Sequence, residues 1–195
     1  MLSPRSTPGA LAAWLVLVLL LAEFAWAGPL RISNLAVTNS EKTLLVAMVL
    51  LGSLPDGVVE GLGTGIPATL RYQVELWQYN RWWLNRRIAA KILERQVVYD
   101  VLTKEYRVSA MQGEEREPYV TRDIWEAERV MSEVRTLPLV PIGSLSGQEL
   151  YYVRARADLR SGVPDSSLSK IVPLWTSRVE TEWEQSPLLT INRAR

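Results

Sequence analysis

A regular alternation of apolar and polar residues over 70–76 is the feature that most constrains how this chain can fold. Leu70, Tyr72, Val74 and Leu76 alternate with Arg71, Gln73 and Glu75. Because successive side chains of a β-strand point to opposite faces of a sheet, this period of two predicts a half-buried strand. The strand opens a longer stretch, 69–108, which we interpret as two long strands joined by a turn and as the spine of a sheet.

The second strand of this pair is less regular. Ile88, Ala90 and Ile92 share one phase, whereas Leu93, Val97, Tyr99 and Val101 share the other. A change of phase near Leu93 and Glu94 predicts a β-bulge, in which one extra residue reverses the buried side. A helix is the alternative, because Ala89, Leu93 and Val97 are spaced four residues apart. The branched and aromatic residues of 97–101 favour the strand.

Further strands are predicted at 30–37, 149–160 and 168–184, and 42–51 is either a central strand or the start of a buried helix. The segment 149–160 alternates most cleanly. Its two sets are Tyr151, Val153, Ala155, Ala157 and Leu159, and Tyr152, Arg154, Arg156, Asp158 and Arg160. We expect the first set to face the core and the second to face solvent or a partner.

Helices are few. Asp123 and Glu126 have the spacing of a capping box, followed by the apolar residues Ile124, Ala127, Met131 and Val134, which predicts a helix that ends before Pro138. Pro55 and Asp56 open a short helical turn. The pattern favours a mostly β fold, an antiparallel two-layer β-sandwich (immunoglobulin-like) with one or two short helices. The alternative is an α+β fold with a helix packed on one antiparallel sheet.

Composition excludes several kinds of chemistry. The chain contains no His and no Cys. Catalysis by Ser-His-Asp or Cys-His groups is therefore excluded, and thiolate and imidazole metal ligands are missing as well. With 22 Lys and Arg against 21 Asp and Glu, the charge is nearly balanced, which argues against a nucleic-acid binder. We expect a protein that is not an enzyme and that needs no cofactor and no metal.

The N-terminus has the pattern of a secretory signal. Arg5 precedes an apolar run over 10–22, and Ala25-Trp26-Ala27 offers small residues at the positions that signal peptidase recognises. We therefore expect a cleavable signal peptide over 1–27, a single β-rich domain over 28–185 and a frayed tail over 186–195. A secreted chain without Cys indicates the periplasm of a bacterial envelope.

Several short motifs occur in a characteristic order. They are Gly65-Ile66-Pro67, the run from Glu75-Leu76 to Trp82-Trp83, Val98-Tyr99 to Leu102-Thr103 with Tyr106, Tyr151 to Arg156 followed by Asp158-Leu159, and Trp175-Thr176-Ser177. In this order the chain resembles domain-of-unknown-function family number 4390 of Gram-negative bacteria. The resemblance implies a periplasmic location. It also implies a signalling role, because members of that family are encoded beside membrane sensor kinases. It supplies no catalytic residues. Val163-Pro164 departs from the Leu-Pro usual in that family.

The densest group of aromatic and basic residues is the candidate binding surface: Trp77, Arg81, Trp82, Trp83, Arg86 and Arg87. Trp and Arg are the residues enriched where proteins bind partners, and they also suit anionic lipid headgroups. The structural alternative is that Trp82 or Trp83 caps one end of the sandwich, with arginines lying over the rings.

Two functions remain open from the sequence. The first is a non-catalytic envelope interaction module that docks on an envelope or inner-membrane protein, as an accessory to a membrane sensor kinase, with peripheral contact to anionic lipid. The second is a periplasmic carrier of a small ligand or lipid with a pocket inside the sandwich. A large apolar cavity would favour the carrier, and a filled core with an exposed Arg/Trp surface would favour the module.

Overall fold

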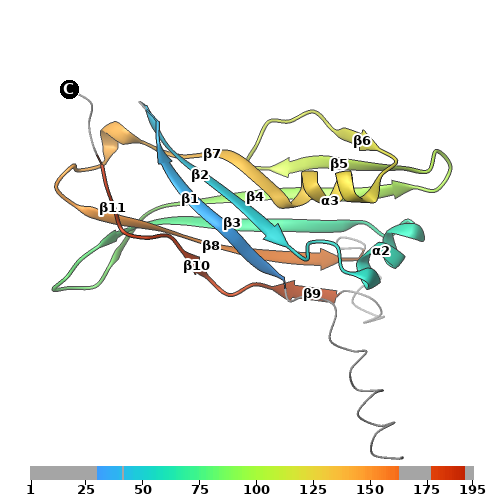
Figure 1. Cartoon of the computed structure of the whole chain (residues 1–195), viewed down its shortest axis with the longest axis horizontal. Helices are drawn as coiled ribbons and strands as arrows, with labels where there is room; N and C mark the ends of the chain where they lie inside the picture. Colours follow the sequence, from blue (N-terminus) through green and yellow to red (C-terminus); the bar gives the residue numbers. More distant parts are fainter. Residues whose placement is uncertain (1–29, 41, 163–176, 192–195) are drawn as a thin grey trace, which may run out of the picture.

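The computed structural model describes residues 30–40, 42–162 and 177–191, which form two antiparallel β-sheets and two short helices (Figure 1). The small sheet has the order β1 (Arg31–Asn39), β2 (Thr43–Leu51), β7 (Glu133–Pro141). The large sheet has the order β10 (Glu184–Gln185), β8 (Leu150–Ser161), β3 (Ala68–Tyr79), β4 (Arg86–Asp100), β5 (Glu105–Gln112), β6 (Tyr119–Thr121). Two further short strands, β9 (Ser177–Glu180) and β11 (Leu189–Thr190), also pair with β8. The predicted mostly β, antiparallel sandwich with few helices is confirmed.

The core lies between the two sheets and takes alternate residues from both. Its central members are Leu44, Val46, Met48 and Leu50 of β2, Leu70, Tyr72, Val74 and Leu76 of β3, and Val153, Ala155, Ala157 and Leu159 of β8. The inward-facing residues predicted for β3 and β8 are therefore confirmed, but Tyr152 and Asp158, which were expected to face solvent or a partner, are buried within the protein. The segment 43–51 is the central strand of the small sheet and not the start of a helix.

The prediction of a phase change in β4 at Leu93 and Glu94 is wrong. Leu93, Arg95 and Val97 are all buried, so the same side of β4 faces the core through this region. The pairing between β4 and β5 is irregular here, but the extra residue is Met111 of β5. The sequence pattern misled because Arg95 occupies a core position, where alternation is normally recognised by an apolar residue.

The bulge in β4 lies nearer its start. Leu76 pairs with Ala89 and Trp77 pairs with Arg87, so Ile88 is the extra residue. Ile88 and Ala89 both pack against the core as a result. A bulge of this kind strengthens the local twist of the strand, and it changes which side of the sheet the residues before it face.

Arg95 is buried in the space between the large sheet and the second helix, α3 (Ile124–Ser132). Its guanidinium donates to both carboxylate oxygens of Glu114, at 2.5 and 2.9 Å. It also donates to the main-chain carbonyls of Val130, Met131 and Glu133, at 2.7, 3.3 and 2.8 Å. The last carbonyls of a helix have no partner inside the helix, so Arg95 satisfies the end of α3.

Tyr72 of β3 hydrogen-bonds to the same end of α3 as Arg95 does. Its hydroxyl donates to the carbonyls of Met131 and Ser132, at 3.2 and 2.9 Å. Burial raises the pKa of Tyr72, and this effect outweighs the opposing influence of Arg95, so the hydroxyl keeps its proton and remains a donor. Two polar side chains of the large sheet thus hold the junction at which α3 becomes β7.

The start of α3 is as predicted, but only half of the capping box forms. The Asp123 carboxylate accepts from the main-chain N–H of Trp125 at 2.9 Å. Glu126 instead accepts from Arg129 and from the hydroxyl of Tyr119. The N–H of Asp123 donates to the Thr121 hydroxyl, which replaces the bond that Glu126 was expected to accept.

β7 begins directly after α3, in a segment where the sequence predicted a helix ending before Pro138. Val134, predicted as the last apolar residue of the helix, is a buried residue of this strand. Pro138 was expected to lie just beyond the helix, yet Pro138 and Pro141 both lie in β7. The strand tolerates them because it lies at the edge of the small sheet, where a missing N–H costs no ladder bond.

The remaining elements complete the ends of the sandwich. The helix α2 (Asp56–Gly63) forms where Pro55 and Asp56 predicted it, and a short 3-10 turn, η1 (Ile142–Ser144), follows β7. The expected frayed tail over 186–195 needs correction, because 189–190 form β11 and Ile191 is buried. Of the strand predicted over 168–184, the part up to 176 lies outside the described residues, and the rest is β9 and the start of β10.

Gly113 allows a test of how closely β5 and β4 approach. Both Gly113 and Gly65 have positive φ, 85° and 84°, but a Cβ at Gly113 would lie 2.0 Å from the carbonyl oxygen of Ile92, whereas Gly65 has open space. We expect Gly65→Ala to destabilise by about 1–2 kcal/mol through backbone strain alone. Gly113→Ala should cost about 1–3 kcal/mol more, because the backbone must also shift. Urea unfolding of the two variants measures the difference, and equal costs would contradict this packing.

Candidate functional site

The structure divides the predicted site residues into two groups. Arg81, Trp82, Trp83 and Arg86 lie at the turn between β3 and β4, at one end of the molecule (Figure 1). Trp77 and Arg87 belong to a network on the outer face of the large sheet. The first group, together with Leu84, is called the hairpin apex below. The two groups differ in exposure and in the contacts that hold them.

The three apolar side chains of the hairpin apex are almost completely exposed. Trp82, Trp83 and Leu84 expose 84%, 79% and 81% of their surface. The structural alternative, in which Trp82 or Trp83 caps an end of the sandwich, is therefore wrong. Sequence analysis missed Leu84, although its position directly after two tryptophans was the available signal.

Polar side chains hold the turn in shape. The N–H of Asn80 donates to the side-chain oxygen of Asn85, and the N–H of Trp82 donates to the side-chain oxygen of Asn80, both at 3.0 Å. The Asn85 amide then donates to the hydroxyl of Tyr152 in β8, at 3.1 Å. Asn side chains commonly stabilise turns by bonding to nearby backbone groups. Here they also attach the turn to the next strand, so the exposed rings are displayed on a braced loop.

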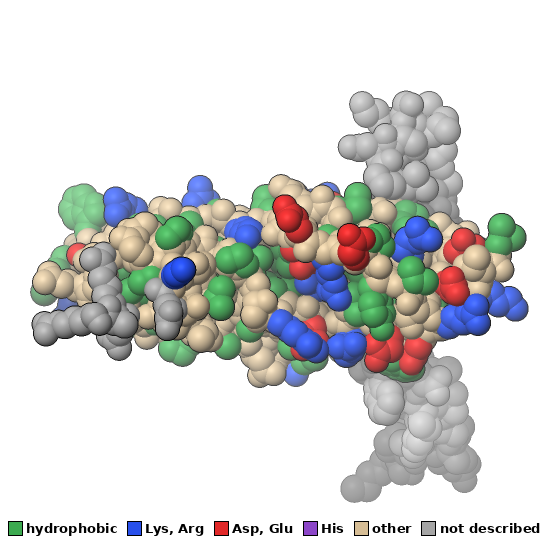
Figure 2. Space-filling model, turned by 90° about the horizontal axis from the view of Figure 1, so that it is seen from above, with side chains coloured by type: hydrophobic (Ala, Val, Ile, Leu, Met, Phe, Trp, Pro, Cys, Tyr) green, Lys and Arg blue, Asp and Glu red, His purple; other side chains and the backbone are tan. Residues whose placement is uncertain are grey.

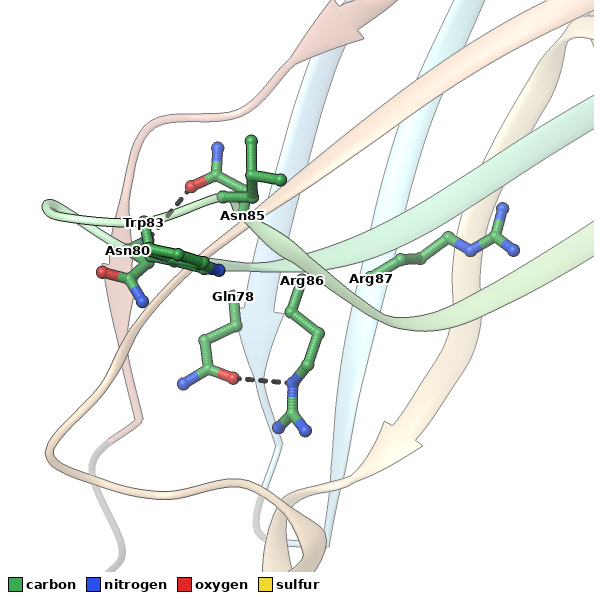
Figure 3. Close-up of a pocket in the computed structure, with 7 residues that line it drawn as sticks. Gln78, Asn80, Trp83, Asn85, Arg86 and Arg87 are labelled. Atoms are coloured by element: carbon green, nitrogen blue, oxygen red, sulfur yellow. Dashed lines mark hydrogen bonds between the residues drawn. The ribbon is translucent and has the colours of Figure 1, made fainter.

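The two basic side chains of the apex make different contacts. The Arg81 guanidinium lies 5.3 Å from the centre of the Trp82 ring. Arg86 donates to the side-chain oxygen of Gln78 at 3.2 Å, and Figure 3 shows these two side chains on one side of the hairpin, below Trp83, while Arg87 points away from them. A hollow of about 580 Å³ opens here, lined by Gln78, Asn80, Trp83, Leu84, Asn85, Arg86 and Arg87. It is open to solvent and bounded by arginine and amide groups.

Trp77 and Arg87 contact Glu75, which is only 1% exposed although it points to the outer face. Its carboxylate accepts from Arg154 at 2.7 Å and from Arg87 at 3.1 Å. It also accepts from the Trp77 indole N–H at 2.8 Å and from Gln73 at 2.9 Å. Burial raises the pKa of Glu75, but the hydrogen bonds from Arg154, Trp77 and Arg87 lower it further than burial raises it. Glu75 is therefore a buried, ionised centre of the outer face.

Arg154 connects this centre to the end of the chain. Its guanidinium lies 4.4 Å from the ring centre of Trp77 and 4.3 Å from that of Trp183. Trp77 also stacks on Tyr152, with ring centres 6.5 Å apart. Guanidinium groups favour the faces of aromatic rings. Trp77 and Arg87 are thus structural members of this network, which sequence analysis had assigned to the binding surface.

The other outward residues of β8 are also paired within the protein. Arg160 and Arg178 contact Asp158 at 2.9 and 2.8 Å, and Arg156 bonds to Gln73 at 3.0 and 3.1 Å. Burial raises the pKa of Asp158, whereas the bond from Arg160 and the charges of both arginines lower it below its usual value. The row 154–160 thus carries local charge pairing.

A second hollow, of about 700 Å³, lies beside α3 and β7. Charged residues contribute much of its lining, among them Lys91, Arg95, Glu114, Arg129 and Glu133. A carrier for an apolar ligand would instead present an apolar cavity inside the sandwich. Among the described residues, no group of three or more carboxylates is placed to hold a metal ion. Nor is any helix within the described ranges long and apolar enough to cross a bilayer.

Truncating residues of the hairpin apex should affect the free energy of unfolding less than truncating residues of the Glu75 network. We expect Trp82→Ala and Trp83→Ala to change the free energy of unfolding by less than about 0.5 kcal/mol, because their side chains are exposed. Trp77→Ala should cost about 2 kcal/mol, since it removes a half-buried ring from Arg154 and Tyr152. Urea unfolding of the three variants gives the comparison. A large loss at Trp82 or Trp83 would mean that the apex packs against the domain.

Glu75 should make stability depend on acid. Its folded pKa is lowered below the ordinary value of 4.5, so its contribution is complete above that value and is lost as the pH falls through the folded pKa. We expect Glu75→Gln to cost about 2 kcal/mol at neutral pH and to lose less stability than the wild type on acidification. The exposed Glu60→Gln is the control and should follow the wild-type curve. Parallel curves for Glu75→Gln and wild type would contradict the assignment.

Comparison with known proteins identifies the family. The family model described as "Domain of unknown function (DUF4390)" matches residues 27–186. No curated protein and no solved structure matches the chain. The matched range contains β1 to β10 and both groups of site residues. Because the match covers most of the chain, this protein belongs to the DUF4390 family, as the order of its motifs indicated.

Proposed function

We propose that the protein is a non-catalytic interaction module of the bacterial envelope that docks on an inner-membrane protein, with a sensor kinase as the favoured class of partner. In this proposal the segment 1–27 directs the chain to the periplasm and is removed there. The recognition surface is the hairpin apex, and Gln78 and Asn85 form the adjoining polar floor.

The observation that carries the proposal is the exposure of adjacent Trp, Trp and Leu side chains on a braced turn. Aromatic and Arg side chains are the usual energetic centres of protein interfaces. A turn that is already held by Asn80, Asn85 and Tyr152 has little conformational entropy left to lose when a partner binds. These features support binding as the task of this surface.

Chemistry supports a module over an enzyme. The chain has no His or Cys, and Glu75, the most deeply buried carboxylate among the described residues, is engaged by Arg154, Arg87 and Trp77. A general base needs a pKa near the working pH, whereas the pKa of Glu75 is lowered. The hollow beside the apex is open to solvent and the hollow beside α3 has a largely charged lining, which supports a module over a carrier of apolar ligands.

The structure indicates which arginines can be tested by charge reversal. Arg87 bonds to the buried Glu75, so reversing its charge would bring two carboxylates together and disturb the fold. Arg81 lies over an exposed ring, and Arg86 donates to an amide oxygen. Their charges can therefore be reversed with little effect on stability.

A photoreactive residue at position 86 in cells tests the proposal. We expect one dominant crosslinked membrane protein, and we expect the yield to fall by about tenfold in a variant that carries Arg81→Glu and Trp83→Ala, because each removes an interface anchor. A photoreactive residue at Leu102, an exposed position in the turn between β4 and β5, is the matched control and should not capture that protein. An identical yield with the apex variant, or equal capture from Leu102, would refute docking through the apex.

A further inference from the structure

The area of the hairpin apex restricts what can cover it. Two indoles of about 150–250 Å² each, at close to 80% exposure, present roughly 240–400 Å². A stable protein interface takes about 800 Å² from each partner. The two indoles of the apex are therefore too small to form such an interface alone. A small, convex apolar tip is instead suited to entering a lipid interface, where Trp rings are enriched.

The charges around the tip have one sign. Residues 76–93 contain Arg81, Arg86, Arg87 and Lys91 and no Asp or Glu. Arg87 is paired with Glu75 and Lys91 donates to the carbonyl of Pro138, so Arg81 and Arg86 are the basic residues beside the tip, one on each side in the chain. Figure 2 shows hydrophobic and basic side chains at this end of the molecule. Basic residues next to an apolar insertion are attracted to anionic headgroups, which adds to the affinity of the apolar part.

The opposite end of β4 offers an internal comparison. The turn between β4 and β5 also exposes apolar side chains, Val101 at 56% and Leu102 at 93%. Its charged neighbours are Asp100, Lys104 and Glu105, so its local charge is not basic. Exposed apolar residues alone thus occur at both ends of the strand. Of these two turns, the hairpin apex is the one that combines them with tryptophans and with two basic residues, Arg81 and Arg86, that contact a ring and an amide oxygen.

The hydrogen bonds that hold the turn also support the entry of the apolar tip into a lipid interface. A flexible loop would fold its rings back onto the domain, whereas Asn80 and Asn85 fix the backbone and Trp82 and Trp83 remain in solvent. The Arg81 guanidinium lies over the Trp82 ring, so a cation would accompany this indole when it enters a lipid interface. The apex is therefore shaped before it meets a surface.

We propose that Trp82, Trp83 and Leu84 insert into the interface of a membrane rich in anionic lipid, with Arg81 and Arg86 on the headgroups. This inference rests on the proposed function, because it places the docking module on the bilayer beside its membrane-embedded partner. The three apolar side chains of the apex then contact lipid, and the adjoining polar floor of Gln78 and Asn85 is left for the protein partner.

A single label tests the insertion directly. The chain has no Cys, so Leu84→Cys can be labelled uniquely with an environment-sensitive fluorophore, and Leu102→Cys provides the matched label at the other turn. With vesicles of phosphatidylglycerol and phosphatidylcholine, we expect the emission at position 84 to shift to the blue and that at position 102 to stay unchanged. Because the readout is local, binding of the purified protein through another segment does not produce it.

Charge variants test the anionic part of the proposal. In the Leu84→Cys background, Arg81→Gln and Arg86→Gln should each raise the lipid concentration at half response by about fivefold. Vesicles of phosphatidylcholine alone should give little response. A label at position 84 that stays in water on anionic vesicles would overturn the proposal. A response that is equal on both vesicle types and indifferent to the arginines would overturn the role of the headgroups.

The two proposals can fail separately. If position 86 captures one membrane protein in cells while the label at 84 never enters lipid, the module stands and the lipid contact is refuted. If the label enters anionic lipid while position 86 captures no protein, the lipid contact stands and docking on a protein is refuted. Capture of the same protein from position 84 itself, without a lipid response, would assign the apex to that protein.

Discussion

The buried guanidinium of Arg95 is the interaction on which the arrangement of the two sheets most depends. It lies on β4 of the large sheet, yet three of its acceptors are carbonyls of the segment in which α3 ends and β7 begins. Glu114 neutralises its charge from the other side. A buried charge is tolerated only when it is paired and fully hydrogen-bonded, and this one is. Through it, the edge strand of the small sheet is held at a fixed place over the large sheet.

A second charged centre stabilises the opposite face. Glu75 collects Arg87 from β4, Arg154 from β8 and the indole of Trp77, and Arg154 in turn lies between Trp77 and Trp183. The strands of the large sheet are thus tied by side chains as well as by their backbone ladder. Because Trp77 lies just before the turn and Arg87 just after it, this network also supports the hairpin that carries the exposed rings.

The sequence predicted those parts of the fold in which the residue pattern and the environment agree. β3 and β8 alternate apolar and polar residues, so both strands could be located from the sequence. β7 was missed because Pro138 and Pro141 usually end a strand, and only its place at the sheet edge makes them harmless. The bulge of β4 was misplaced because Arg95 disguises a core position as a polar one. For the site, the rings of Trp82 and Trp83 were identified, but no pattern could reveal that Glu75 draws Trp77 and Arg87 into the sheet.

The length of β4 has a consequence for how the molecule opens. Its 15 residues run from Arg86 at the apex to Asp100 at the far turn, and they include Arg87 and Arg95, one from each charged centre. The hairpin cannot separate from the sheet without breaking the Glu75 network, and the rest of β4 cannot separate without exposing Arg95. The apex and the sandwich should therefore form one cooperative unit, with amide hydrogens of the hairpin exchanging chiefly through global unfolding. Anything that binds the apex would then stabilise the whole domain by mass action and not the loop alone.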